Sequence, residues 1–162
     1  MNYDVFLALQ NEQLLPEAGE SDQAFMERVL AAAYAPGEEA TADRIYNRME
    51  PAFHSCSAQE KQLCIAYRAE AWTLNPQDTL HGGALSTAID MAMSVLARYL
   101  KKLRSIVTVQ LSINFLRPIQ AGDTYLVKAW ADHVGRRSVM IRCEVCSAST
   151  GKMAATASGV FL

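Results

Sequence analysis

The stretch HGGALSTAIDMAMSVLARYLKKL, residues 81–103, decides the architecture of this 162-residue chain. Its apolar side chains recur at helical spacing on nearly every side, so we predict one helix over 82–103, about six turns long. A helix that is apolar nearly all round is buried on most of its sides. Other elements of the chain must therefore pack around it.

Segments of alternating polarity follow this helix. Residues 105–116 place apolar side chains at the odd positions from Val107 to Phe115, and polar ones such as Thr108 on the opposite face. Strict alternation of this kind predicts a strand. Strands are expected over 63–73, 105–116, 124–134, 138–147 and 152–162. We therefore predict an α+β fold in which an antiparallel sheet wraps around the long central helix.

The first sixty residues follow a different pattern. Helices are expected over 3–14, 22–34 and 41–49. Ser21 and Asp22 suit the start of the second helix, Pro36-Gly37 its end, and Thr41 the start of the third. We therefore divide the chain into a helical N-terminal extension, residues 1–60, and a second domain, residues 61–162.

Charge is distributed unevenly between these two parts. Residues 1–60 contain eleven acidic and three basic residues, a net charge of −8, whereas residues 61–162 contain six acidic and twelve basic residues, a net charge of +6. An acidic extension argues against binding of nucleic acid, because neutralising phosphates needs the opposite charge. The basic second part suits a ligand that carries phosphate groups.

Neither an export signal nor a membrane span is expected. Residues 1–10 contain no Lys or Arg, and the apolar segment 84–103 is interrupted by Asp90, Arg98 and two lysines. We therefore expect a cytoplasmic protein with reduced thiols.

Two cysteines, Cys143 and Cys146, have the spacing of some metal and redox sites. On a strand, this odd spacing puts the two side chains on opposite faces. No second pair of ligands completes a zinc site. We interpret them as ordinary cysteines and expect no metal.

Several short motifs occur in a fixed order within residues 62–162. They are Thr79-Leu80-His81-Gly82-Gly83, Asn114-Phe115-Leu116-Arg117-Pro118, Gly122-Asp123, Gly135-Arg136-Arg137-Ser138 and Ala155-Thr156-Ala157-Ser158-Gly159-Val160-Phe161. With the order strand, long helix, four strands, they resemble the hotdog-fold acyl-coenzyme A thioesterases, in particular the phenylacetate-degradation (PaaI-like) subfamily. The resemblance implies hydrolysis of acyl-coenzyme A, with coenzyme A as part of the substrate and no other cofactor.

The resemblance also implies roles for single residues. Asp90 corresponds to the catalytic carboxylate, and Gly82 to the glycine whose amide forms the oxyanion hole. Asn75 corresponds to an asparagine that assists at the thioester, and Thr108 to a hydroxyl that places water or the carboxylate. The chain departs from the family at Asp78, where a glycine is usual, and this puts the shape of the loop that holds Asn75 in question.

These residue types suit thioester hydrolysis. Asp90 lies on an otherwise apolar helix, where a carboxylate is costly unless it meets water, a partner or a substrate. It can act as base or nucleophile, and the alternative is a buried carboxylate paired with an arginine or with backbone amides. The amides of Gly82 and Gly83 are unsatisfied within the helix and suit an oxyanion. His81 is interpreted as a hydrogen-bonding group of the helix start, with catalysis as the alternative.

Helix geometry sets a condition on this site. Gly82 and Asp90 are eight residues apart, about 12 Å along the axis of one helix. Both must reach the same carbonyl carbon, and one helix cannot arrange that. We therefore predict a homodimer with two shared sites, each with Asn75 and Gly82 from one subunit and Asp90 and Thr108 from the other. Two such dimers can pair further into a tetramer.

Residues of the helix start and of one predicted turn are expected to contact the substrate, and three alternative functions stay open. Gly83, together with Arg136, Arg137 and Ser138 in a predicted turn, is a candidate to bind the substrate and its phosphates. One alternative is a hotdog module that binds acyl-coenzyme A without catalysis. Another is a hotdog hydratase, which needs a catalytic histidine paired with an acid. A third is an N-terminal extension that serves contacts with other proteins.

Overall fold

One antiparallel sheet and one long helix dominate the computed structural model, which describes residues 2–35 and 43–162. Six strands are ordered β1-β2-β4-β5-β6-β3 across the sheet. The strands are β1 (Ala52–Ser57), β2 (Gln62–Arg68), β3 (Thr108–Phe115), β4 (Thr124–Val134), β5 (Val139–Ser147) and β6 (Met153–Phe161). The helices are α1 (Asp4–Gln10), α2 (Asp22–Ala33), α3 (Ile45–Arg48) and α4 (Gly82–Lys101), with a short 3-10 turn η2 (Ala71–Thr73).

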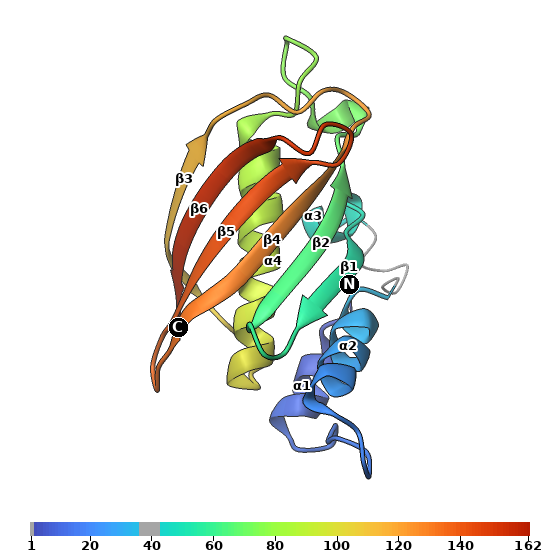
Figure 1. Cartoon of the computed structure of the whole chain (residues 1–162), viewed down its shortest axis with the longest axis vertical. Coiled ribbons are helices and arrows are strands. Elements are labelled where there is room, and N and C mark those ends of the chain that lie inside the picture. Colours follow the sequence, from blue (N-terminus) through green and yellow to red (C-terminus); the bar gives the residue numbers. More distant parts are fainter. Residues whose placement is uncertain (1, 36–42) are drawn as a thin grey trace.

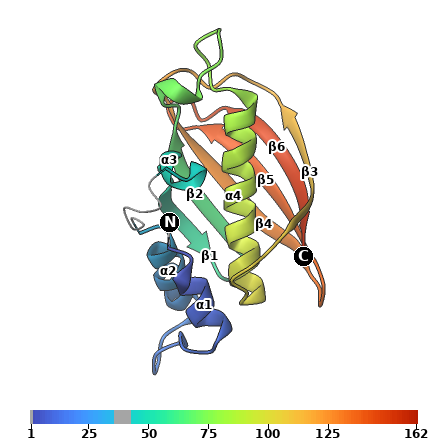
Figure 2. The same ribbon diagram turned by 180° about the vertical axis from the view of Figure 1, so that it is seen from behind.

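Helix α4 lies along one face of the twisted sheet, which we call the inner face (Figures 1 and 2). The predicted long helix is confirmed, and so is the α+β arrangement around it. The helix ends at Lys101 because the next residue, Lys102, adopts a left-handed backbone conformation with φ of 51°. Apolar side chains of α4 and of the inner face form the core; they include Leu85, Ile89, Met93, Leu96, Val127 and Ile141.

The structure differs from the sequence-based prediction on the N-terminal side of α4. The strand expected over 63–73 ends at Arg68, and Ala71–Thr73 form a 3-10 turn. Strand β1 was missed altogether. Its sequence, AFHSCS, has no regular alternation, and none of its residues is fully buried, because β1 is an edge strand.

Helix α2 packs beside β1 and binds its end. The Gln23 side chain donates to the carbonyl of Cys56 and accepts from the amide of Ala58, both at 2.9 Å. These two hydrogen bonds satisfy backbone groups that an edge strand otherwise exposes. Figure 2 shows α1 and α2 at the β1 side of the sheet, on the opposite flank of α4 from β3.

The N-terminal helices share their core with the sheet and α4. Ser21 caps α2 as predicted, accepting from the Ala24 amide at 3.2 Å. Phe6 and Met26 are fully buried within the same apolar cluster as α4. The predicted cap at Thr41 and the break at Pro36-Gly37 lie outside the described residues. The division of the chain at residue 60 stays a prediction.

The four cysteines are free thiols. Cys143 is buried on the inner face, and Cys146, half-buried, lies on the opposite face, as the strand spacing predicted. Burial raises the pKa of the Cys143 thiol, which keeps it unreactive. Within residues 2–35 and 43–162, no three His, Cys, Asp or Glu side chains are placed to hold a metal ion. In the same residues, no helix has both the length and the apolar character needed to cross a membrane.

Two stacked tyrosines in the core differ in how their hydroxyls are paired. The rings of Tyr67 and Tyr125 lie 5.6 Å apart, nearly parallel. The Tyr67 hydroxyl donates to the carbonyl of Ala88 at 3.3 Å, whereas the buried Tyr125 hydroxyl has no hydrogen-bond partner in the described part of the chain. We expect Tyr125→Phe to raise the free energy of unfolding by about 1 kcal/mol, because it removes an unsatisfied buried group.

Urea unfolding of the two single variants tests this expectation. Tyr67→Phe is the matched control and should lower the free energy of unfolding by about 1 kcal/mol, since it removes the hydrogen bond from the Tyr67 hydroxyl to the Ala88 carbonyl. Equal destabilisation by both substitutions would show that the Tyr125 hydroxyl is satisfied.

Candidate active site

Asp90 lies in the middle of α4 and is half-buried. Its Oδ1 accepts a hydrogen bond from the Thr108 hydroxyl at 2.7 Å. No other hydrogen bond or ion pair to the Asp90 side chain occurs among residues 2–35 and 43–162. The pairing with an arginine or with backbone amides, which would make Asp90 a structural carboxylate, is therefore not seen. Its second oxygen is available to water or substrate.

A β-bulge in β3 makes the contact between Asp90 and Thr108 possible. Thr108 pairs with Phe161 and Gln110 pairs with Val160, so Val109 is an extra residue in β3. Thr108 therefore lies on the inner face, on the same side as Phe115. In a regular strand, two residues an odd number of positions apart would lie on opposite faces. The predicted strict alternation of residues 105–116 is wrong at this point. Val109 is 56% exposed rather than packed on the inner face.

Gly82 is the first residue of α4 and follows the cap residue His81. The His81 Nδ1 accepts from the amide of Gly83 at 2.9 Å, so His81 is a capping group, as the sequence indicated. The Gly83 amide is thereby occupied. In the described part of the chain, no acceptor pairs with the Gly82 amide. This amide is thus free at the positive end of the helix, where it suits an oxyanion.

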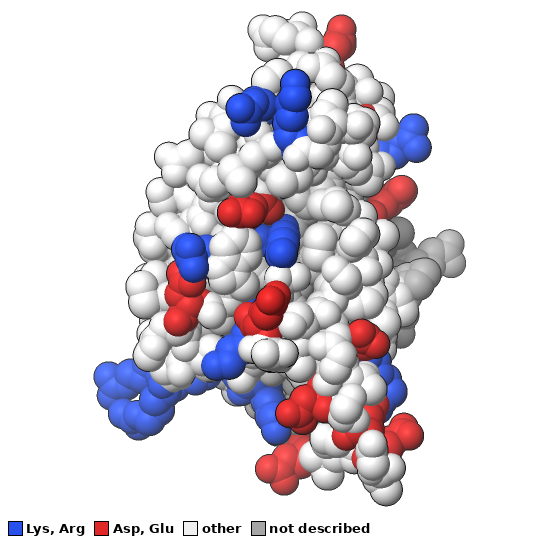
Figure 3. All heavy atoms as spheres, in the orientation of Figure 1, with Lys and Arg blue, Asp and Glu red and all other residues white. Residues whose placement is uncertain are grey.

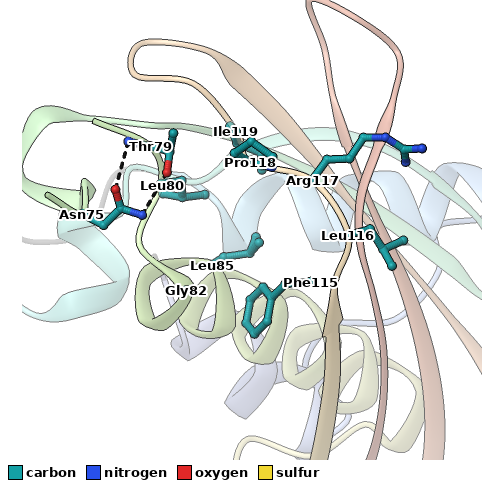
Figure 4. A pocket seen from close by; sticks show the side chains of 10 residues that line it. All are labelled: Asn75, Thr79, Leu80, Gly82, Leu85, Phe115, Leu116, Arg117, Pro118 and Ile119. Carbon is teal, nitrogen blue, oxygen red and sulfur yellow. Dashed lines mark hydrogen bonds between the residues drawn. The ribbon is translucent and has the colours of Figure 1, made fainter. Parts of the chain in front are cut away.

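A cleft of about 340 Å³ opens beside Gly82. Figure 4 shows the side chains around it, with the Phe115 ring close to the first turn of α4. The cleft is lined by Asn75, Thr79, Leu80, Gly82, Leu85, Phe115, Leu116, Arg117, Pro118 and Ile119. Asn75 and Gly82 therefore line one cleft. Asp90 and Thr108 do not line it, so a single chain does not bring the four residues together.

Asn75 organises its own loop. Its Oδ1 accepts from the amides of Gln77 and Thr79 at 2.9 and 3.2 Å, and its Nδ2 donates to the Thr79 hydroxyl at 2.9 Å. Asp78, the departure from the family pattern, has φ of 55°. Glycine adopts this conformation without strain, and Asp is among the few other residues that tolerate it. The loop that holds Asn75 is thus closed despite Asp78.

We expect Asp78→Gly to raise the free energy of unfolding by about 0.5–1 kcal/mol, because glycine relieves the left-handed conformation. Urea unfolding measures this. Asp78→Val is the opposite control and should destabilise, since a β-branched side chain is strained at positive φ. A glycine variant less stable than the wild type would show that the Asp78 side chain itself supports the loop.

The predicted phosphate contacts lie at the other end of α4. Arg136 and Arg137 are exposed in the β4–β5 turn, with Ser138 half-buried beside them. Lys101 docks this turn on the end of α4, donating to the carbonyls of Gly135 and Arg136 at 2.7 and 2.8 Å. The turn is therefore about 28 Å along the helix from Gly82 of the same chain. Only the Arg136–Arg137 turn of a partner subunit could lie nearer to Gly82.

The surface reflects the charge asymmetry of the sequence. In Figure 3, basic side chains protrude at the lower left, where Figure 1 places the β4–β5 turn, and acidic side chains gather at the lower right over α1 and α2. The acidic side chains over α1 and α2 thus lie at the opposite end of the molecule from the start of α4.

The sequence motif Phe115-Leu116-Arg117-Pro118 supplies cleft residues that the prediction used only as marks of resemblance. Phe115 and Leu116 are 56% and 50% exposed. Alternation alone put Phe115 on the apolar face of the strand predicted over 105–116, and it could not show that Phe115 and Leu116 are exposed beside the cleft. Their exposure is explained by the position of β3 at the sheet edge.

Known proteins resemble this chain in sequence. Residues 77–154 match the family model of the thioesterase superfamily. The chain is 30% identical over 103 residues to a candidate esterase of Pseudomonas aeruginosa, covering 63% of this chain and 75% of that protein. It is 25% identical over 103 residues to the acyl-coenzyme A thioesterase THEM4 of Bos taurus (64% of this chain, 41% of that protein). It is 27% identical over 110 residues to a candidate esterase of Caenorhabditis elegans (68% and 65%). The chain thus spans less than two thirds of the last two proteins.

Solved structures share the fold. A phenylacetic acid degradation-related protein of Ralstonia eutropha JMP134 has a TM-score of 0.67 at 24% identity, over 99% of this chain and 98% of that chain. A Streptococcus mutans UA159 protein bound to acetyl CoA has a TM-score of 0.59 at 22% identity, over 69% and 86% of the two chains. The predicted hotdog fold is confirmed.

Proposed function

Because this chain belongs to the thioesterase superfamily, we propose that it hydrolyses acyl-coenzyme A thioesters to a free acid and coenzyme A. The observation that carries this proposal is the Asp90 carboxylate, held by Thr108 at 2.7 Å on an otherwise apolar helix. A half-buried carboxylate with one oxygen free is suited to a reacting group. Coenzyme A is part of the substrate, and the chemistry requires no other cofactor.

The proposed reaction needs an attacking group and a stabilised oxyanion. Asp90 either takes a proton from water as water attacks the thioester carbonyl, or attacks the carbonyl itself to give an anhydride that water then cleaves. In both routes the carbonyl oxygen becomes negative, and the Gly82 amide donates to it. The carbon–sulfur bond breaks as the thiolate of coenzyme A leaves; it takes its proton from Asp90 in the first route and from solvent in the second. Thr108 fixes the orientation of Asp90.

We infer that two chains build each site. Strand β3 is an edge strand, and two valines are exposed there, Val107 just before the strand at 65% and Val109 within it at 56%. Thr108 begins β3 beside Asp90, and Phe115 ends it beside Gly82. Two β3 strands paired antiparallel about a two-fold axis would place the Asp90 end of one chain beside the Gly82 end of the other. Two such dimers can pair further into a dimer of dimers.

The proposal also covers the contacts with coenzyme A and the location of the protein. Binding of coenzyme A is supported by the acetyl CoA in the Streptococcus mutans protein with the same fold. Arg136, Arg137 and Ser138 stay candidates for contacts with substrate across the dimer. A cytoplasmic location is supported by the four free thiols.

Thiol release from a panel of acyl-coenzyme A esters tests the proposal. We expect turnover by the wild-type protein on at least one ester, and a dimer or larger oligomer on gel filtration. Binding of acyl-coenzyme A without turnover would favour the non-catalytic module instead. Hydration of an enoyl ester would favour a hydratase, although the His81 ring nitrogen next to Gly83 already serves as a helix cap.

A further inference from the structure

A second hollow of about 250 Å³ lies next to the cleft beside Gly82. It is lined by Arg117, Pro118, Gln120, Asp123, Ser147, Ser149, Thr150, Lys152 and Ala154. Arg117 and Pro118 line both spaces. The two are therefore neighbours that meet at these two residues. Figure 4 shows Arg117 extending away from Gly82, out of the first cleft.

The side chains of this second hollow suit a phosphate group. Arg117 donates through Nη1 to the carbonyl of Met153 at 2.8 Å, which fixes the guanidinium while its other N–H groups stay available. Lys152 forms no side-chain hydrogen bond or ion pair within the described residues. The hydroxyls of Ser149 and Thr150 are bonded to the Ser147 hydroxyl, at 3.1 and 3.0 Å. Two cations in one hollow match an anion that accepts several hydrogen bonds.

The one acidic side chain of the hollow is already engaged. Asp123 accepts from the Ser147 hydroxyl at 2.6 Å. That hydroxyl also accepts from the amide and the hydroxyl of Thr150, at 3.2 and 3.0 Å. Ser147 is only 7% exposed, and Gly151 turns the chain with φ of 66°. The β5–β6 turn is thus held in place by its own hydrogen bonds before any ligand binds.

We propose that the hollow of Arg117 and Lys152 binds phosphate groups of the coenzyme A part of the substrate. This inference rests on the proposed function. With the thioester at Gly82, the pantetheine arm follows the first cleft past Phe115 to Arg117 and Pro118, and the phosphates enter the second hollow. The alternative site, the Arg136–Arg137 turn, is exposed and stands far from Gly82 of the same chain.

A comparison of two substrates tests the proposal. Hexanoyl-coenzyme A and hexanoyl-N-acetylcysteamine carry the same thioester, but only the first has phosphates. We expect Lys152→Gln and Arg117→Gln each to raise KM for the coenzyme A ester about tenfold, with kcat kept. Parameters for the N-acetylcysteamine ester should stay unchanged. The matched control is Lys128→Gln, which removes one charge from an exposed lysine of β4 outside both spaces and should change KM less than twofold. Arg136→Gln/Arg137→Gln tests the alternative site.

Several results would overturn the proposal. They are an unchanged KM in the Lys152 variant, equal losses on both substrates, or a tenfold rise in KM in the Arg136/Arg137 variant alone. Calorimetric binding of coenzyme A itself to the same proteins gives a second readout that needs no turnover. If the wild type hydrolyses no ester, the proposed function fails, while a tenfold weaker binding of coenzyme A by Lys152→Gln would still support the hollow. Unchanged binding would refute it.

Discussion

Asp90→Asn is expected to lower kcat for acyl-coenzyme A hydrolysis by about 10³-fold, the contribution of a positioned base or nucleophile. The substitution keeps the size of the side chain and an oxygen that can accept from Thr108, so the hydrogen bond of 2.7 Å can persist. The fold and substrate binding should therefore survive. Thiol release under saturating substrate, with thermal unfolding of both proteins, measures the effect.

Two further variants separate catalysis from structure at this position. Asp90→Ala should lose as much activity as Asp90→Asn, since neither can take a proton or attack. Thr108→Val removes the hydroxyl that orients the carboxylate but leaves the carboxylate itself, and we expect a smaller loss, about tenfold. A kcat within threefold of wild type in Asp90→Asn would exclude the proposed role of Asp90.

The second large effect is expected at Gly82. Proline at this position removes the backbone N–H and nothing else that the helix needs. Gly82 is the first residue of α4, where proline is well tolerated. His81 before it has φ −65° and ψ 134°, an extended conformation that proline favours in the preceding residue. A Cβ at Gly82 would lie 3.5 Å from the Phe115 ring, an ordinary contact.

Gly82→Pro should therefore leave stability nearly unchanged and lower kcat about 10²–10³-fold, the usual loss when one oxyanion donor is removed. Gly82→Ala is the control, because it adds the Cβ but keeps the amide, and it should retain most of the activity. If the proline variant is as active as the alanine variant, the Gly82 amide does not stabilise the oxyanion.

Mixing the two inactive proteins tests whether sites are shared. A hybrid dimer of one Gly82→Pro chain and one Asp90→Asn chain has one site with both defects and one site with none. After subunit exchange at equal amounts, half of the dimers are hybrids, so activity should return to about a quarter of wild type for a two-fold dimer. Sites built within single chains would give no recovery.

Long-range periodicity made the central helix and the later strands predictable. The apolar pattern over 82–103 gave α4 to within two residues, and the alternation after Gly122 gave β4 in full. These elements are buried on at least one face, so apolar residues recur in their sequences at the spacing of a helix or a strand. Edge strand β1 has no such burial and hence no such pattern.

The site itself was predictable in its residues but not in its arrangement. Asp90, Thr108 and Gly82 came from the resemblance, and the helix spacing indicated that one chain cannot bring them together. The bulge at Val109 that turns Thr108 toward Asp90 depends on pairing with β6, fifty residues later, and leaves no mark in the local sequence. The hollow of Arg117 and Lys152 likewise exists only because β3 and β6 are neighbours.

The two edges of the sheet are not equivalent, and this has a consequence for assembly. The end of β1 is bound by the amide of Gln23 from α2, whereas β3, at the other edge, has exposed valines at Val107, just before it, and Val109. A sheet that could grow at both edges would join head to tail into fibres. With α2 beside one edge, the proposed association through β3 would be isologous and would stop at two copies. The N-terminal helices would in this way act as a terminator that protects the protein from polymerisation.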